Sequence, residues 1–272
     1  MWKPEEEEFF VGYAPPMPPR LGRFVRQVVI GIGCLLLIVA VTLASGHLRL
    51  EGGTFEFGHP KSFSGTIVEH PYPGFRLDGV DSNVEPWPLL VASGKHGAGA
   101  LVSGLEGRHL TLTGTRIERG AHTMIEVEPA SLRSKVSESA TMETAPLIER
   151  SDKGAVELTG EIVDSKCFFG VMVPGSGKTH KECASLCLRG GIPPALYVQD
   201  RAGHSSLLLL VGPTGEPIGA RALQAAGEAI SLTGSIQRRG GWVVLRTNPT
   251  SWHRVDYRAP RHDSESSASN ER

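Results

Sequence analysis

The sequence predicts a mainly β fold: an N-terminal transmembrane helix, then two small OB-like β-barrels, the second with a helical Cys/His insertion. Three observations predict it. Residues 28–44 form an uncharged apolar run, two later segments resemble each other, and three cysteines and a histidine fall within residues 167–187. With 33 Gly and 19 Pro among 272 residues and only 6% aromatics, the composition favours short strands joined by turns over long helices.

The apolar run predicts a membrane helix over residues 28–46. About 20 apolar residues are enough to cross a hydrocarbon core of about 30 Å as a helix. A cleaved signal peptide is the alternative, because residues 44–46 read Ala-Ser-Gly and offer small side chains for cleavage. The long segment before the run, with aromatic residues at Trp2, Phe9 and Phe10, favours a retained anchor.

Basic residues before the helix predict its orientation. Arg20, Arg23 and Arg26 precede the run, and few basic residues follow it closely. Basic residues concentrate on the cytoplasmic side of membrane helices. We therefore expect a cytoplasmic tail at residues 1–27 and a single-pass protein of the bacterial inner membrane with its C-terminal domains in the periplasm.

Two pairs of similar segments predict an internal repeat. Residues 63–69 (FSGTIVE) match 158–164 (LTGEIVD), and residues 110–120 match 230–240. Each segment alternates apolar and polar residues around a central glycine, which is typical of a half-buried strand with a bend or bulge. A glycine turn and another apolar stretch then follow, as in a hairpin.

The repeat defines two domains, at residues 55–130 and 154–258. Short strands that include long, glycine-kinked ones favour small closed barrels of the OB type. An immunoglobulin-like sandwich is the alternative, but these lengths leave little room for seven strands per copy. The Ser- and Glu-rich residues 131–153 predict a linker, and residues 259–272 have the composition of a disordered tail.

The second copy holds 25 more residues than the first between its matching strands, and the cysteines lie in this insertion. Thr179 and Glu182 form a capping box that predicts a helix start at Thr179, and Gly190 predicts its end in the left-handed conformation. His180, Cys183 and Cys187 then share one helical face, which Cys167 could approach from the end of the preceding strand.

Three thiolates and an imidazole would suit Zn or Cu, so we predict Cys167, His180, Cys183 and Cys187 as metal ligands. Two alternatives remain open. Cys167 could form a structural disulfide with Cys183 or Cys187, leaving one spare thiol, since exported cysteines usually pair. A redox pair could instead use Cys183 as the attacking thiol and Cys187 or Cys167 as its resolving partner.

Charge and motif content narrow the function classes. Lys and Arg total 28 and Asp and Glu total 29, and the resulting formal charge of −1 argues against nucleic-acid binding. The sequence has no Ser-His-Asp pattern, paired acids or dinucleotide fingerprint. We therefore favour a non-enzymatic accessory or metal-binding protein, anchored by one helix, with a protein partner in an envelope complex. The alternative hypothesis is a purely structural subunit that a disulfide stabilises.

Residues 160–194, from GEIVDSKC through HKECASLCLRGGIPP, resemble a segment of uncharacterised bacterial membrane-anchored proteins with a C-terminal OB-like domain. The resemblance covers about forty residues. It implies a bacterial source and an exported site, and it carries no activity.

Overall fold

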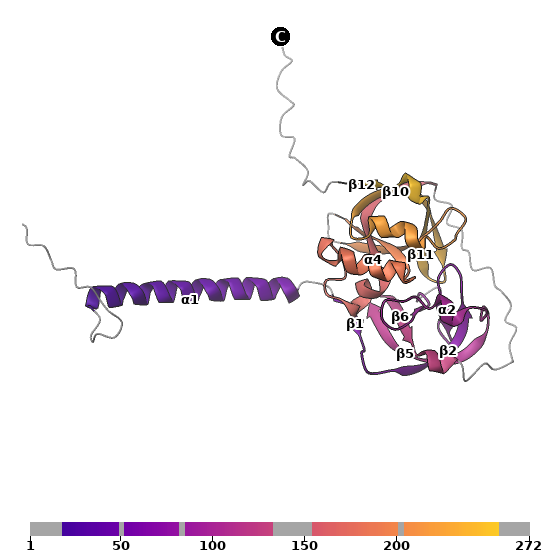
Figure 1. Ribbon diagram of the computed structural model, residues 1–272, viewed down its shortest axis with the longest axis horizontal. Coiled ribbons are helices and arrows are strands. Elements are labelled where there is room, and N and C mark those ends of the chain that lie inside the picture. Colours follow the sequence, from indigo (N-terminus) through magenta and orange to yellow (C-terminus); the bar gives the residue numbers. More distant parts are fainter. Residues whose placement is uncertain (1–17, 49–51, 82–84, 133–153, 201–203, 256–272) are drawn as a thin grey trace, which may run out of the picture. The chain divides into compact units, whose positions relative to one another are not determined.

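The computed structural model describes residues 18–48, 52–81, 85–132, 154–200 and 204–255. The chain divides into two units, one ending at Glu51 and one beginning at Gly52 (Figure 1). The predicted linker, apart from Ser131 and Leu132, lies outside the described residues, as do residues 1–17 and the predicted disordered tail.

The first unit is the helix α1 (Pro19–Leu48). It is long and apolar enough to cross a membrane by length and composition. It begins at Pro19, within the stretch predicted to be a cytoplasmic tail, and includes the three arginines that precede the apolar run. Proline suits the first turn of a helix, because the N–H it lacks would have no partner there.

The first barrel closes as the OB pattern requires. Its strands are β1 (Thr54–Phe55), β2 (Lys61–Val68), β3 (Gly74–Leu77), β4 (Leu89–Val91), β5 (His109–Arg119) and β6 (His122–Val127). Around the barrel the order is β5-β2-β3-β4-β6, and β6 pairs with β5 to close it. The β4–β6 pair is parallel and the others are antiparallel. Two short helices, α2 (Gly99–Val102) and α3 (Pro129–Leu132), lie between and after these strands.

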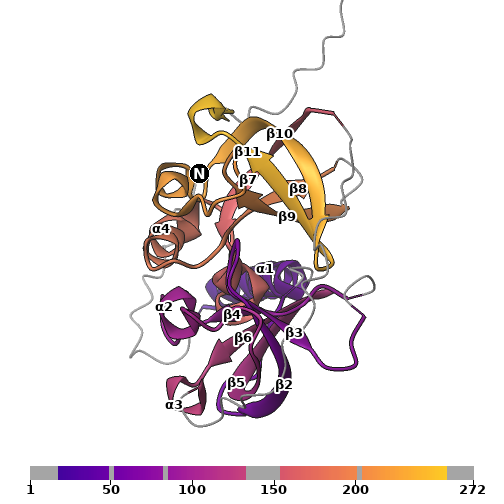
Figure 2. The ribbon, with the colours of Figure 1, turned by 90° about the vertical axis from the view of Figure 1, so that its right-hand side faces the viewer.

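The second barrel repeats this arrangement (Figure 2). It consists of β7 (Val156–Asp164), β8 (Pro194–Gln199), β9 (Ser205–Val211), β10 (Ala229–Arg239) and β11 (Trp242–Thr247), with β12 (His253–Arg254) at its edge. The 3-10 helices η3 (Gly219–Ala225) and η4 (Pro249–Ser251) complete it. Two closed five-stranded barrels confirm the mainly β, OB-like fold and exclude the sandwich. That the two copies form an internal sequence repeat stays a prediction.

The central glycines lie where long strands change partners. β2 pairs with β5 as far as Thr66 and with β3 from Gly65 onward, and β5 passes from β2 to β6 at Gly114. In the second barrel β7 changes partners next to Gly160, and β10 does so at Gly234. A side chain at any of these glycines would overlap a neighbouring strand. The predicted bend therefore marks the corner at which each strand turns around its barrel.

The two barrels pack against each other through a shared hydrophobic cluster. Buried residues of both barrels form one cluster, which lies between the separate cores of the two barrels. Trp242 Nε1 donates a hydrogen bond to the Trp87 carbonyl at 2.8 Å, and the Tyr72 hydroxyl donates one to the Leu210 carbonyl at 2.6 Å. The buried ammonium of Lys166 pairs with Glu126 at 2.6 Å. These contacts make the barrels one compact unit.

The insertion, residues 165–193, connects β7 to β8, where the first barrel has only residues 69–73. It contains the short π-helix η1 (Cys167–Val171), the 3-10 helix η2 (Lys178–His180) and the helix α4 (Lys181–Arg189). The predicted helix start was wrong: Thr179 lies inside η2, and α4 begins at Lys181 with no side-chain cap. The predicted helix end was one residue early, because Gly190 has a φ of −75° and Gly191 takes the left-handed conformation at +90°.

Candidate metal and thiol site

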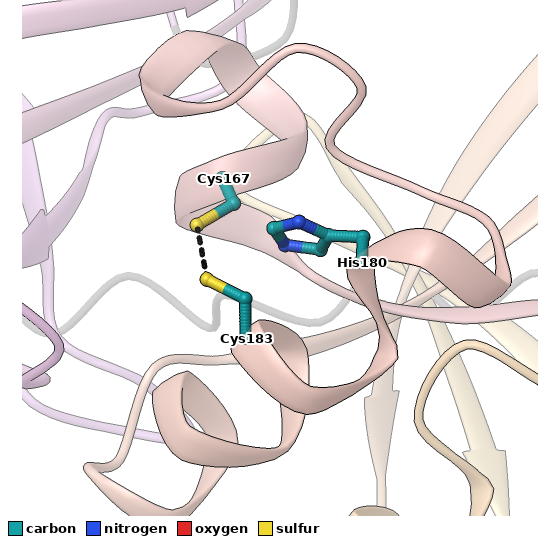
Figure 3. A group of neighbouring side chains, drawn as sticks. All are labelled: Cys167, His180 and Cys183. Carbon is teal, nitrogen blue, oxygen red and sulfur yellow. Dashed lines mark hydrogen bonds between the residues drawn. The ribbon is translucent and has the colours of Figure 1, made fainter.

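The candidate residues come from three neighbouring elements of the insertion. Cys167 begins η1, just after β7 ends, His180 ends η2, and Cys183 lies on α4; Figure 3 shows these three side chains. Cys187 lies one turn after Cys183 on α4. Cys167, Cys187 and His180 are buried, whereas Cys183 is partly exposed. The folding of the insertion thus gathers side chains that are up to twenty residues apart in the chain.

The sulfur atoms of Cys183 and Cys187 both lie close to that of Cys167, with no covalent bond between them. Cys167 Sγ is 3.9 Å from Cys183 Sγ and 3.8 Å from Cys187 Sγ, and all four cysteines of the chain are free thiols. A disulfide requires about 2.05 Å. The structure therefore does not contain the predicted disulfide staple.

These separations match those of thiolates that share a metal ion. Two sulfurs bound to one metal at about 2.3 Å lie about 3.8 Å apart in tetrahedral coordination. In trigonal coordination with the same bond length they lie about 4.0 Å apart. The distances from Cys167 to its two partners fall in this range.

The four predicted ligands do not all surround one point. Ligand atoms of Cys167, His180 and Cys183 lie within 4.8 Å of one another, and so do those of Cys167, Cys187 and Asp164. Cys167 belongs to both groups. Closing the full set around one ion therefore requires a movement, which is easiest for Cys183, the most exposed of the three thiols.

Asp164, the last residue of β7, organises the site from inside. Its side chain is fully buried, its Oδ1 accepts the backbone N–H of Cys167 at 2.8 Å, and its Oδ2 lies 3.0 Å from His180 Nε2. A carboxylate on one ring nitrogen fixes the imidazole and leaves the other nitrogen for a metal, as is usual for metal-binding histidines. Sequence reasoning did not include Asp164 in the site; its position three residues before the first cysteine was the available signal.

The pKa values of the two buried thiols, Cys167 and Cys187, shift in opposite directions. A hydrogen bond to Cys187, burial and the nearby Asp164 carboxylate raise the pKa of Cys167. The hydrogen bond from Cys167 and the Lys95 ammonium lower the pKa of Cys187, while burial opposes them. Without a metal, the pair therefore holds a proton on Cys167 and favours the thiolate at Cys187.

The first barrel contributes a residue that sequence reasoning missed. Lys95, in the loop between β4 and α2, places its Nζ 2.8 Å from Cys183 Sγ and 3.9 Å from Cys187 Sγ. The hydrogen bond to Cys183 raises the pKa of Lys95. The contact spans 88 residues of sequence, and no local pattern marks it.

Two contacts hold the Lys95 loop against the insertion. The Gly97 N–H donates to the Gly190 carbonyl at 2.9 Å, at the end of α4. On its other side, Lys166 Nζ donates to the carbonyls of Ala92 at 2.8 Å and Gly94 at 2.6 Å. Because Lys166 immediately precedes Cys167, the loop is joined to the site at both of its ends.

No family model, curated protein or solved structure matches this chain. The resemblance of residues 160–194 therefore stays a prediction.

Proposed function

We propose that the insertion of the second barrel binds one soft metal ion, Zn(II) or Cu(I), through Cys167, His180, Cys183 and Cys187. The observation that carries the proposal is the position of Cys167 Sγ, 3.8 and 3.9 Å from the other two sulfurs. Thiolate and imidazole ligands favour these ions. The hydrogen bond that the buried Asp164 carboxylate accepts from His180 supplies the outer support that metal-binding histidines usually have.

The same proposal includes a location. α1 is a candidate membrane anchor, and Arg20, Arg23 and Arg26 at its start favour a cytoplasmic N-terminus. The two barrels would then lie in the periplasm of a bacterium, held at the inner membrane by a single pass. We infer a non-enzymatic accessory role in an envelope complex, in which a protein partner contacts the barrels.

Thiol–disulfide exchange is the second candidate, and the environment of Cys183 favours it. This sulfur is partly exposed, lies in the first turn of α4 and accepts a hydrogen bond from Lys95 at 2.8 Å. Its thiolate would attack a disulfide of a partner protein, form a mixed disulfide and release one partner sulfur as a thiolate. The Cys167 sulfur, 3.9 Å away, would give up its proton and attack Cys183 Sγ, which releases the second partner thiolate and leaves a Cys167–Cys183 disulfide.

Metal and thiol counting on the full chain, purified reduced in detergent, separates the two candidates. After incubation with Zn(II) or Cu(I) and removal of excess ion, metal binding predicts one ion per chain and three thiols that a chromogenic thiol reagent reaches only after denaturation. Cys183→Ser should lower both the amount of bound metal per chain and the number of protected thiols. The matched control is Cys34→Ser in α1, which should leave the bound metal unchanged.

Two results would contradict the proposed metal site. A metal-free protein that forms a Cys167–Cys183 disulfide, and transfers it to added thiols, supports exchange chemistry and overturns metal binding. If His180→Ala binds metal as tightly as the unsubstituted chain, the four-ligand arrangement is wrong.

A further inference from the structure

The two charged groups nearest the thiols have opposite signs and come from different barrels. Asp164 lies beneath Cys167 in the second barrel, and the Lys95 ammonium of the first barrel lies over Cys183 and Cys187. Lys95 also interacts electrostatically with Cys167, so its charge acts on all three sulfurs. A cation bound by these sulfurs would therefore have a fixed positive charge beside it.

The backbone contacts of Lys95 keep this charge near the site. The hydrogen bond from Gly97 to Gly190 and the two from Lys166 hold the loop on both sides of Lys95. A metal about 2.3 Å from Cys183 Sγ would lie no more than about 5 Å from Nζ in the present conformation, given the 2.8 Å between Nζ and that sulfur.

We propose that Lys95 makes the thiol site selective for a monovalent soft ion, Cu(I), over Zn(II). The proposal rests on the metal-binding function above and specifies its ligand. Three thiolates with Zn(II) carry a net charge of −1, and with Cu(I) they carry −2. The ammonium therefore stabilises the Cu(I) complex by the attraction of one additional unit charge.

The size of the preference follows from Coulomb's law. One unit charge at about 5 Å changes the ratio of the two affinities about fourfold at the dielectric constant of water, and more at the lower effective values found near protein surfaces. Deprotonation of the thiols and the folding of the insertion are common to both ions. The ratio of the Cu(I) and Zn(II) affinities therefore isolates the effect of the charge.

The test measures both affinities at one pH on the full chain in detergent, by competition with chromophoric chelators and without oxygen for Cu(I). Lys95→Met should lower the ratio of Cu(I) to Zn(II) affinity at least fourfold, because the Cu(I) complex loses the attraction of one more unit charge than the Zn(II) complex does. Lys95→Arg keeps the charge and should keep most of the ratio. Lys61→Met, which removes a lysine paired with Glu56 on the surface of the first barrel, is the matched control and should change nothing.

Each outcome has one reading. If both ions bind the unsubstituted chain and Lys95→Met leaves their ratio unchanged, selectivity by Lys95 is refuted and the metal site stands. If Lys95→Arg lowers the ratio as much as Lys95→Met, the charge is not the cause and the proposal fails. If neither ion binds the unsubstituted chain, the proposed metal function itself is wrong.

Discussion

Replacing Gly190 with alanine tests whether the loop that carries Lys95 is held by close contact with the end of α4. A Cβ atom at Gly190 would lie 1.7 Å from the Lys95 carbonyl oxygen, whereas Cβ contacts below 3.0 Å are essentially never seen. The two segments must therefore separate by about 1.3 Å. That movement weakens the Gly97–Gly190 hydrogen bond and carries Lys95 away from Cys183.

The expected cost is steric. Overpacking of this kind typically destabilises a protein by about 1–3 kcal/mol. Gly190 has a φ of −75°, which any residue adopts, so the backbone conformation adds no penalty. Without the overlap, Gly→Ala at such a position would stabilise the fold by about 0.4–1 kcal/mol, because the unfolded chain becomes less flexible. The overlap therefore decides the sign of the effect.

Urea unfolding of the full chain in detergent, followed by tryptophan fluorescence, measures the change. Gly99→Ala is the matched control, because a Cβ there meets nothing within 4 Å. We expect Gly190→Ala to lose about 1–3 kcal/mol and Gly99→Ala to lose none. A Gly190→Ala variant as stable as the control would show that the loop does not pack on α4 as described.

Three further predictions concern contacts within the barrel unit. Tyr72→Phe leaves the Leu210 carbonyl and the Ile218 N–H without their hydroxyl partner. It should lower the free energy of unfolding in urea by about 1–3 kcal/mol. Tyr197→Phe, which removes a hydroxyl with no described hydrogen bond, should lower it less. Burial lowers the pKa of His122, so the folded state binds fewer protons than the unfolded one. The free energy of unfolding should therefore fall as the pH drops below about 6.5. His122→Gln should flatten this dependence on pH in unfolding measured from about pH 7.5 to 5. A slope that His122→Gln leaves unaltered would contradict this origin. Asp164→Asn replaces the carboxylate oxygens that fix Cys167 and His180 and should weaken metal binding about 10- to 100-fold in chelator competition; an unchanged affinity would show that Asp164 does not orient the site.

Patterns in the sequence were sufficient to predict the barrels, because the matched glycines at 65, 114, 160 and 234 recur where a long strand must change partners. Alternating apolar residues around a glycine have few other structural uses. The grouping of the cysteines also followed from local spacing, since Cys183 and Cys187 are one helical turn apart and Cys167 follows the strand that leads into the insertion.

The rest of the site depends on tertiary contacts without a local signature. Lys95 meets Cys183 across 88 residues, and Lys166 reaches the Ala92 carbonyl across 74. Both contacts exist only because the two barrels pack together. The helix start predicted from the capping box was wrong for a different reason. The 3-10 helix η2 directly precedes α4, so Thr179 already lies inside a helical segment and cannot cap α4.

X-ray absorption at the metal edge of the reconstituted full chain counts the ligand atoms around the ion. We expect three sulfur ligands near 2.3 Å and, for a four-coordinate ion such as Zn(II), one nitrogen near 2.0–2.1 Å that is lost in His180→Ala. A shell of oxygen and nitrogen atoms with one sulfur or none would contradict it.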